Sequence, residues 1–294
     1  MKFCATELEG MPTEDSKHRV DSARETFAKK ISADAGLRGP SEIRAAFAST
    51  PREQFLGKGP WTILTREGFR KSPSDDPALV YCDAPIAIDP QKGINNGQPS
   101  LYARCFAALN IQHGETVTHI GAGTGYYTAI LAKLTGAGGV VHAFEIEAHL
   151  AERAADNLAE MGNVTVYARS GSDGPLPDCD VIYVSAGATA PQRVWLEALR
   201  SGGRLLFPLT DAKGAGAVLM ITRSSPGAFQ AEFVSSVMFI ACVGARDEAT
   251  EERLAEAFAR GDVQRVRSLR LDAEPDRTCW FAGRDWWLSR AEVG

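Results

Sequence analysis

The chain has 294 residues, of which 44% are hydrophobic and 23% charged, and its formal net charge is −5. These values predict a globular protein large enough for one large domain or two small ones. The acidic balance argues against nucleic acid as the main partner, and the sequence shows neither an apolar run of membrane-spanning length nor a signal-peptide layout. We therefore expect a cytoplasmic protein, a monomer or a homodimer, with no nucleic-acid or membrane partner.

The cysteines and histidines give no sign of a metal site. The six cysteines are scattered without a C-x-x-C pair, which is typical of reduced thiols in a reducing compartment. The five histidines lack metal-ligand spacing, and His119 and His142 stand inside predicted strands. A hydrogen-bonded core histidine is the expected role for both, and no bound metal is expected.

Residues 1–40 are polar and poor in large apolar side chains. This composition predicts an N-terminal arm or a partly disordered leader. The alternative is a surface helix over Asp15–Ser32, because Val20, Phe27 and Ile31 form a thin apolar stripe at helical spacing.

Residues 41–110 are predicted to form an N-terminal cap region. Ser41 can cap a short helix at the start of this region. Residues 57–78 are rich in glycine, proline, serine and charge, which predicts an exposed loop or insertion. Pro99 is well placed in the first turn of a helix predicted over Pro99–Leu109.

The stretch Val117–Leu134 has the strongest local signal. The short apolar run Val117–Ile120 predicts a buried strand, glycines follow at alternate positions (Gly121, Gly123 and Gly125), and helical spacing of apolar residues comes next. Glycine suits such a turn because it tolerates positive φ and lets a ligand approach the backbone. Phosphate or NAD binding and a degenerate pocket are the alternatives, but a dinucleotide fingerprint would have its third glycine where Tyr126 stands.

A second predicted strand, Val140–Phe144, ends on Glu145. An acid at this place, about 20 residues past the glycine turn, can accept hydrogen bonds from both hydroxyls of a ribose. Strands predicted over 163–168, 180–185 and 204–207, with a helix over 147–161, continue the alternation, and later strands are predicted over 218–222 and 233–241. The fold class is therefore α/β, a doubly wound, mostly parallel and Rossmann-like sheet over residues 111–245 with helices on both faces.

Residues 246–294 are predicted to form a C-terminal extension. Glu248–Arg260 has the pattern of a charged amphipathic helix. The aromatic stretch over 278–288 is expected to pack in the core, with a lid or a dimer surface as the alternatives.

Several motifs in order resemble one family. They are Ala46–Phe55, Tyr81-x-Asp83, Gly97–Ser100, the glycine turn, Asp180–Pro191 and Leu199–Pro208. Together they are similar to protein-L-isoaspartate O-methyltransferases, class I enzymes that use S-adenosylmethionine, and the resemblance covers roughly residues 41–245. It implies S-adenosylmethionine as cofactor, a carboxylate on a peptide or protein as acceptor, and a role in protein repair. A carboxylate is already anionic, so no general base is expected and the protein mainly aligns the reactants.

The resemblance also implies the cofactor residues. They are expected to be Gly121, Ala122, Gly123, Thr124, Gly125, Glu145, Ile146, Ser170, Gly171, Asp173 and Ser185. The family carries a G-D-G run after the third strand, and here the run is Arg169–Gly174. Its acid has either become Ser170 or moved to Asp173.

The acceptor loop is expected to comprise Asn95, Asn96, Gly97, Gln98 and Ser100. Gly97 stands where the family has a serine that helps to hold the acceptor carboxylate, so the chain resembles a divergent member of the family. The amides of Asn95 and Asn96 can replace that donor, or Asn-Asn-Gly is only a turn. The alternative functions are methylation of another acceptor, such as a natural-product peptide or a small metabolite, and cofactor binding without catalysis.

Overall fold

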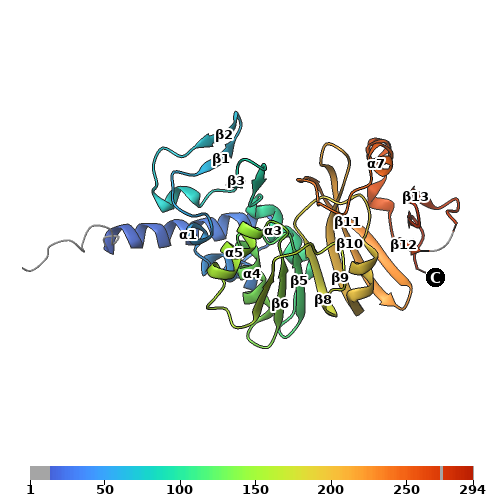
Figure 1. Ribbon diagram of the computed structural model, residues 1–294, viewed down its shortest axis with the longest axis horizontal. Coiled ribbons are helices and arrows are strands. Elements are labelled where there is room, and N and C mark those ends of the chain that lie inside the picture. The colour runs from blue at the N-terminus through green and yellow to red at the C-terminus, as the bar shows by residue number, and fades with distance from the viewer. Residues whose placement is uncertain (1–13, 272–273, 294) are drawn as a thin grey trace, which may run out of the picture.

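The computed structural model describes residues 14–271 and 274–293, which are built around one large sheet (Figure 1). Within these residues the sheet has ten strands, in the order β13-β14-β12-β11-β10-β9-β8-β5-β6-β7. One half pairs in parallel: β7 (Val164–Tyr167), β6 (Val140–Phe144), β5 (Thr116–Ile120), β8 (Cys179–Val184) and β9 (Leu199–Thr210). The other half is antiparallel: β10 (Ala215–Ser225), β11 (Ala228–Met238), β12 (Ser268–Leu271), β14 (Trp286–Ser289) and β13 (Cys279–Ala282).

The parallel half confirms the expected doubly wound, Rossmann-like fold, and helices cover both faces of the sheet. Because side chains alternate along a strand, Tyr183 of β8 enters one core and Val184 the other. The first core lies under five helices from the first half of the chain, and the second lies under α6 (Arg193–Ala198) and α7 (Glu248–Arg260). Two of the covering helices, α4 (Tyr126–Thr135) and α5 (Ala148–Asn157), follow β5 and β6 directly. None of the helices in the described ranges is long and apolar enough to cross a membrane.

The helix α1 (Glu14–Asp34) corrects the expectation of an arm or partly disordered leader. Phe27 and Ile31 are at most 4% exposed and belong to the core formed with α2 (Glu42–Ala48) and α3 (Pro99–Leu109). The alternative of a helix is therefore right for residues 14–34, although its apolar stripe is docked on the body of the protein. The first 13 residues lie outside the described part of the chain.

The segment 57–78, expected to be an exposed loop, contains regular structure. The strands β1 (Thr62–Thr65) and β2 (Gly68–Lys71) form an antiparallel hairpin, which projects beside α1 in Figure 1. Trp61 is only 6% exposed and anchors the base of this β1–β2 hairpin, with its indole N–H donating to the Gly57 carbonyl at 3.0 Å. Nearby lie the 3-10 turns Arg52–Phe55 and Pro77–Val80 and the short pair β3 (Ala87–Asp89) and β4 (Ile94–Asn95).

The aromatic tail packs in the core, as expected. Trp280, Phe281, Trp286 and Trp287 are each about 5% exposed or less. The Trp280 ring meets Phe233 and Phe258 edge to face, with centroids 5.3 and 5.5 Å apart. The tail adds strands to the sheet as well as the helix α7, whose bounds are those predicted.

Candidate active site

The glycine turn connects β5 to α4 at the carboxyl end of the parallel strands. Gly123 has a φ of +57° and Gly125 a φ of +92°, values in the left-handed region that favours glycine. A Cβ at residue 125 would lie 2.8 Å from Cδ1 of Leu158, so the Leu158 side chain would have to move. Gly125 therefore shapes the turn and lies outside the lining of the pocket above it, so its contact with the cofactor stays a prediction.

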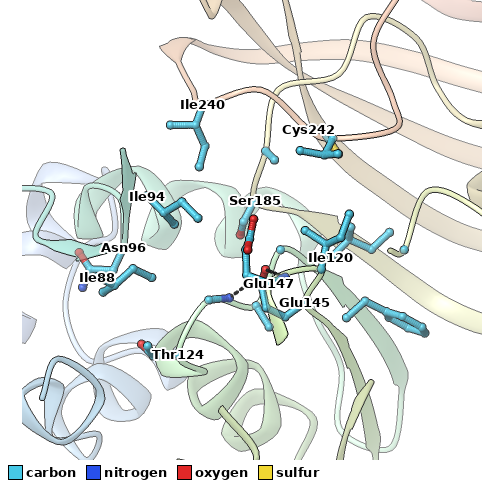
Figure 2. Close-up of a pocket in the computed structure, with 18 of the residues that line it drawn as sticks. Ile88, Ile94, Asn96, Ile120, Thr124, Glu145, Glu147, Ser185, Ile240 and Cys242 are labelled. Carbon is cyan, nitrogen blue, oxygen red and sulfur yellow. Dashed lines mark hydrogen bonds between the residues drawn. The ribbon is translucent and has the colours of Figure 1, made fainter. Parts of the chain in front are cut away.

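A pocket of about 340 Å³ opens above this turn, and we call it the glycine-turn pocket. In Figure 2, Ile88, Ile94 and Asn96 lie on one side of it and Ile120 and Cys242 on the other. The structure brings most predicted cofactor residues together in its lining: Gly121, Ala122, Gly123, Thr124, Glu145, Ile146, Ser170, Gly171 and Ser185. Its walls are mainly apolar, and its polar groups come from backbone amides and a few side chains.

Glu145 follows β6 and is held under the turn. Its Oε2 accepts the Gly123 N–H at 2.7 Å and its Oε1 accepts the Glu147 N–H at 3.0 Å (Figure 2). Burial raises the pKa of the Glu145 carboxyl, and the two N–H bonds oppose that rise. Each oxygen keeps lone pairs that can accept further hydrogen bonds from a ligand.

The loop after β7 contains both candidates for the position of the family's acid, Ser170 and Asp173. Ser170 lines the pocket, whereas Asp173 is exposed and lies outside its lining. The Arg169 guanidinium binds the carbonyls of Ser170 and Asp173, both at 3.1 Å, and this holds the loop in shape. The loop directs its serines and Gly171 toward the pocket, which favours Ser170 over Asp173 as the cofactor contact, and this choice stays a prediction.

A second pocket, of about 610 Å³, adjoins the first and is lined by Leu64 and Phe69 of the β1–β2 hairpin. We call it the hairpin pocket. Gly97, Gln98 and Ser100 line it, together with residues 235–240 at the end of β11. Among the described residues, four line both pockets, and we call them the neck: Asn95, Tyr102, Ser185 and Ile240.

The side chains of the acceptor loop have different roles. Asn96 is 7% exposed, and its Oδ1 accepts from the Arg52 guanidinium at 3.1 Å and from the Ile86 N–H at 2.9 Å. Its Oδ1 therefore braces the loop, while its NH₂ group has no partner among the described residues and lies in the lining of the glycine-turn pocket, so its role as a donor to the acceptor stays a prediction. Asn95 Oδ1 accepts the Gly97 N–H at 2.9 Å, so this stretch is a turn whose first asparagine still reaches both pockets.

Gln98 and Ser100 are tied to Asp83, the acid of the Tyr81-x-Asp83 motif. Asp83 accepts the Ser100 N–H at 2.8 Å, the Ser100 hydroxyl at 2.7 Å and the Gln98 amide at 2.9 Å. This carboxylate caps the first turn of α3 and fixes where the acceptor loop enters it. Both side chains line the hairpin pocket from this fixed position.

The prediction of His119 as a hydrogen-bonded core histidine is confirmed, but sequence reasoning missed its contact with Ser185 and the place of Tyr102 in the site. His119 is 1% exposed, with Nε2 2.9 Å from the Ser185 hydroxyl and Nδ1 2.9 Å from the Thr128 hydroxyl. Burial lowers the pKa of this imidazole to about 3, so the ring is neutral at neutral pH. Its hydrogen bond with the Ser185 hydroxyl fixes the position of that side chain. Tyr102 reaches both pockets from α3, where its place in the helix predicts only core packing.

Comparison with known proteins agrees with this geometry. The family described as "Protein-L-isoaspartate(D-aspartate) O-methyltransferase (PCMT)" matches residues 30–247. The chain is 33% identical to protein-L-isoaspartate O-methyltransferase 1 of Rhodopseudomonas palustris (strain HaA2), over 79% of this chain and 88% of the relative. It is 34% identical to a protein-L-isoaspartate O-methyltransferase of Brucella anthropi, over 69% of this chain and 86% of the relative.

Solved structures show the same fold. One protein-L-isoaspartate O-methyltransferase aligns with a TM-score of 0.64 at 23% identity, covering 80% of this chain and 69% of that one. A putative member from Plasmodium falciparum, in complex with S-adenosyl-L-homocysteine, aligns with a TM-score of 0.60 at 16% identity, covering 74% of this chain and 97% of that one. The glycine turn, Glu145 and the ordered motifs thus lie within the matched region. The chain belongs to the protein-L-isoaspartate O-methyltransferase family.

Proposed function

We propose that this protein transfers a methyl group from S-adenosylmethionine to the carboxylate of an isoaspartyl residue in peptides or proteins, as a repair enzyme does. The observation that carries the proposal is the meeting of the glycine-turn pocket and the hairpin pocket at the neck. A donor in the first pocket and an acceptor in the second can meet in line only there.

The residues of the glycine-turn pocket fit the cofactor. Glu145 offers two fixed carboxylate oxygens for ribose hydroxyls, and the backbone of the turn can approach a ligand closely because Gly121 and Gly123 lack side chains. Ile146 is 45% exposed although it lines the pocket, which leaves an apolar surface for a flat base. When bound, the cofactor supplies a methyl group activated on a sulfonium sulfur.

The chain's own residues position and desolvate the reactants. Ser170 and Gly171 close one side of the glycine-turn pocket, and Lys92 and Glu147 form an ion pair within its lining. The hairpin pocket presents Leu64 and Phe69 to an acceptor, with Arg104 and Lys213 as its cationic groups. A carboxylate acceptor needs no general base, and neutral donors at the neck suffice to orient it.

The cellular compartment and the division of the chain into regions are also proposals. The thiols of Cys82, Cys105, Cys179, Cys242 and Cys279 are free, which supports a reducing, cytoplasmic compartment. The division into a cap over 41–110, a cofactor domain over 111–245 and a C-terminal extension also stays a prediction.

The test is transfer of labelled methyl groups from S-adenosylmethionine to an isoaspartyl peptide, with the normal aspartyl peptide as control. We expect base-labile label on the isoaspartyl peptide alone. Cofactor binding without label on either peptide contradicts the isoaspartyl acceptor.

A second candidate is methylation of a different acceptor, such as a natural-product peptide or a small metabolite. The observations that favour it are Gly97, which offers no hydroxyl at the neck, and the β1–β2 hairpin, whose Phe69 is 42% exposed beside the hairpin pocket. Label that appears on another carboxylate peptide and not on the isoaspartyl form would select this candidate. Binding of cofactor with no turnover on any carboxylate would instead indicate a non-catalytic protein.

A further inference from the structure

The polar side chains of the neck stand where an acceptor oxygen has to arrive. Asn95, Tyr102 and Ser185 line both pockets, and Ile240 supplies an apolar wall opposite them. All three polar groups are uncharged hydrogen-bond donors: an amide, a phenol and an alcohol. Such a set suits an anionic oxygen, because it stabilises the charge without removing the nucleophilic lone pair.

Tyr102 occupies the space that a side chain at residue 97 would need. A Cβ built on Gly97 would lie 2.4 Å from Cε2 and 2.9 Å from the hydroxyl oxygen of Tyr102. Gly97 also has a φ of +68°, which disfavours other residues. The Tyr102 ring therefore fits in this position only because residue 97 has no side chain.

The Tyr102 ring is fixed from two sides. It stacks on Tyr127 with centroids 3.5 Å apart and an interplanar angle of 7°, and the edge of Tyr183 meets it at 5.6 Å. Burial raises the pKa of the Tyr102 hydroxyl to about 12, so this group stays protonated and can donate. A fixed ring with a protonated tip is a preorganised donor.

The other two donors are oriented as well. His119 Nε2 lies 2.9 Å from the Ser185 hydroxyl, and this imidazole is itself held by Thr128. Asn95 uses its Oδ1 to accept the Gly97 N–H, so its NH₂ group carries both remaining donor hydrogens. His119 is thus a positioning residue, since it acts on the acceptor through Ser185.

We propose that the Tyr102 hydroxyl, with Ser185 and Asn95, holds the acceptor carboxylate at the neck and takes the place of a donor side chain at residue 97. This inference rests on the proposed methyltransferase function. In the reaction, the carboxylate oxygen forms a bond to the methyl carbon while the carbon–sulfur bond breaks and its electron pair stays on sulfur. No proton is transferred, so the three donors keep their hydrogens throughout.

The first test compares Tyr102→Phe with Tyr183→Phe as a matched control. The Tyr183 hydroxyl is also buried and belongs to the same aromatic cluster, but Tyr183 lines neither pocket, so its loss removes a buried phenol that an acceptor does not reach. For Tyr102→Phe we expect kcat/KM for the isoaspartyl peptide to fall at least about 10-fold, as for loss of one hydrogen bond to a charged group, with the cofactor Kd within about twofold of wild type. Unchanged kcat/KM overturns the proposal, and so does an equal loss in both variants, which would indicate a packing role.

Failure of the proposed function has a different signature. A wild-type protein that binds cofactor but labels no isoaspartyl peptide refutes the function and, with it, the role of Tyr102 toward that acceptor. An active wild type with an unaffected Tyr102→Phe variant refutes only the role of Tyr102.

A second test addresses the steric relationship and needs no activity. Gly93 has the same φ of +68° as Gly97, but nothing lies within 4 Å of a Cβ built there. We expect Gly97→Ser to lower the urea midpoint of unfolding more than Gly93→Ser does, and Tyr102→Leu to reduce the effect of Gly97→Ser in a double-mutant cycle. Equal shifts for the two serine variants, or no coupling with residue 102, would overturn the claim that Tyr102 fills the place of residue 97.

Discussion

The guanidinium of Arg52 binds the side chain of Asn96 across 44 residues of sequence, with Nη2 3.1 Å from Oδ1. Arg52 is fully buried, and its other acceptors are the backbone carbonyls of Val80, Cys82 and Ala84, at 2.7 to 2.9 Å. Its ring neighbours are Phe27 and Tyr126, whose centroids lie 5.8 and 5.9 Å from the guanidinium carbon. One cation thus ties the first helix, the segment before β3 and the acceptor loop together.

Replacing Arg52 with methionine should lower the free energy of unfolding by about 3–5 kcal/mol, because several buried acceptors lose their donor at once. Urea denaturation of the variant measures this loss. Arg70→Met is the control, since the Arg70 side chain is 61% exposed, and it should change the unfolding free energy by about 0.5 kcal/mol or less. Similar stabilities for the two variants would show that Arg52 does not organise the acceptor loop.

The buried His119 predicts a pH dependence of stability. In the folded protein burial lowers its pKa to about 3, whereas the unfolded chain has the ordinary histidine value of about 6.5. Between these values the unfolded state binds a proton that the folded state does not, so stability is lost as the pH falls. The slope is about 1.4 kcal/mol per pH unit, or about 2 kcal/mol from pH 6.5 to pH 5.

Urea titrations at several pH values test this prediction in the wild type and in His119→Asn. The variant should start from a lower stability and lose less of it on acidification. His113→Asn, in which a 68% exposed side chain is replaced, should keep the wild-type slope. The same slope in all three proteins would contradict a neutral His119 in the folded state.

Glu145 should control cofactor affinity. In Glu145→Gln the new NH₂ group faces the Gly123 N–H or the Glu147 N–H, so one hydrogen bond becomes a repulsion and the charge is lost. We expect the Kd for S-adenosylmethionine to rise about 10- to 100-fold, or about 1.4–2.8 kcal/mol, by titration calorimetry. Glu160→Gln, at an exposed position of the same domain, is the matched control.

The same carboxyl predicts a pH effect on binding. Because burial raises the pKa of Glu145, its protonation on acidification begins at a higher pH than for an ordinary glutamate. Cofactor affinity of the wild type should therefore weaken as the pH falls, and that of Glu145→Gln should change less. A wild-type Kd that is constant down to the ordinary carboxyl range would contradict an ionised Glu145 as the ribose acceptor.

The C-terminal aromatics should act on stability and not on binding. Trp280 is 4% exposed, and its indole N–H donates to the Gly261 carbonyl at 2.9 Å. Trp280→Ala should lower the free energy of unfolding by about 3–5 kcal/mol while the cofactor Kd stays unchanged. A lid would behave in the opposite way, with weaker binding at unchanged stability.

Much of the fold could be predicted because it depends on local patterns. The helices Pro99–Leu109 and Glu248–Arg260 have the predicted bounds, since a proline starts the first and a glycine follows the second. The glycine turn and Glu145 could be predicted for the same reason, because strand, turn and acid follow one another in sequence. The antiparallel half was less visible, although Pro226-Gly227 between β10 and β11 is the signal of a tight hairpin turn.

The remainder depends on contacts between distant residues. The few apolar side chains of α1 do not show from the sequence whether this helix packs on the rest of the protein. It does so because α2 and α3 provide the apolar surface against which they pack. The contact of the Asn96 Oδ1 with Arg52 joins residues 44 positions apart, and Tyr102 looks like a core residue of α3 until Gly97 is seen to leave room for its ring. These contacts position the side chains on the acceptor side of the site. The sequence alone therefore could not show which of them can donate a hydrogen bond to the acceptor.

The central claim is tested most directly by a competition experiment. Equal amounts of the isoaspartyl and aspartyl forms of one peptide are incubated together with the protein and labelled S-adenosylmethionine, and the two products are separated. We predict label on the isoaspartyl form alone, lost on treatment with base. Equal label on both forms, or none on either while the cofactor is bound, would contradict the assignment of an isoaspartyl acceptor.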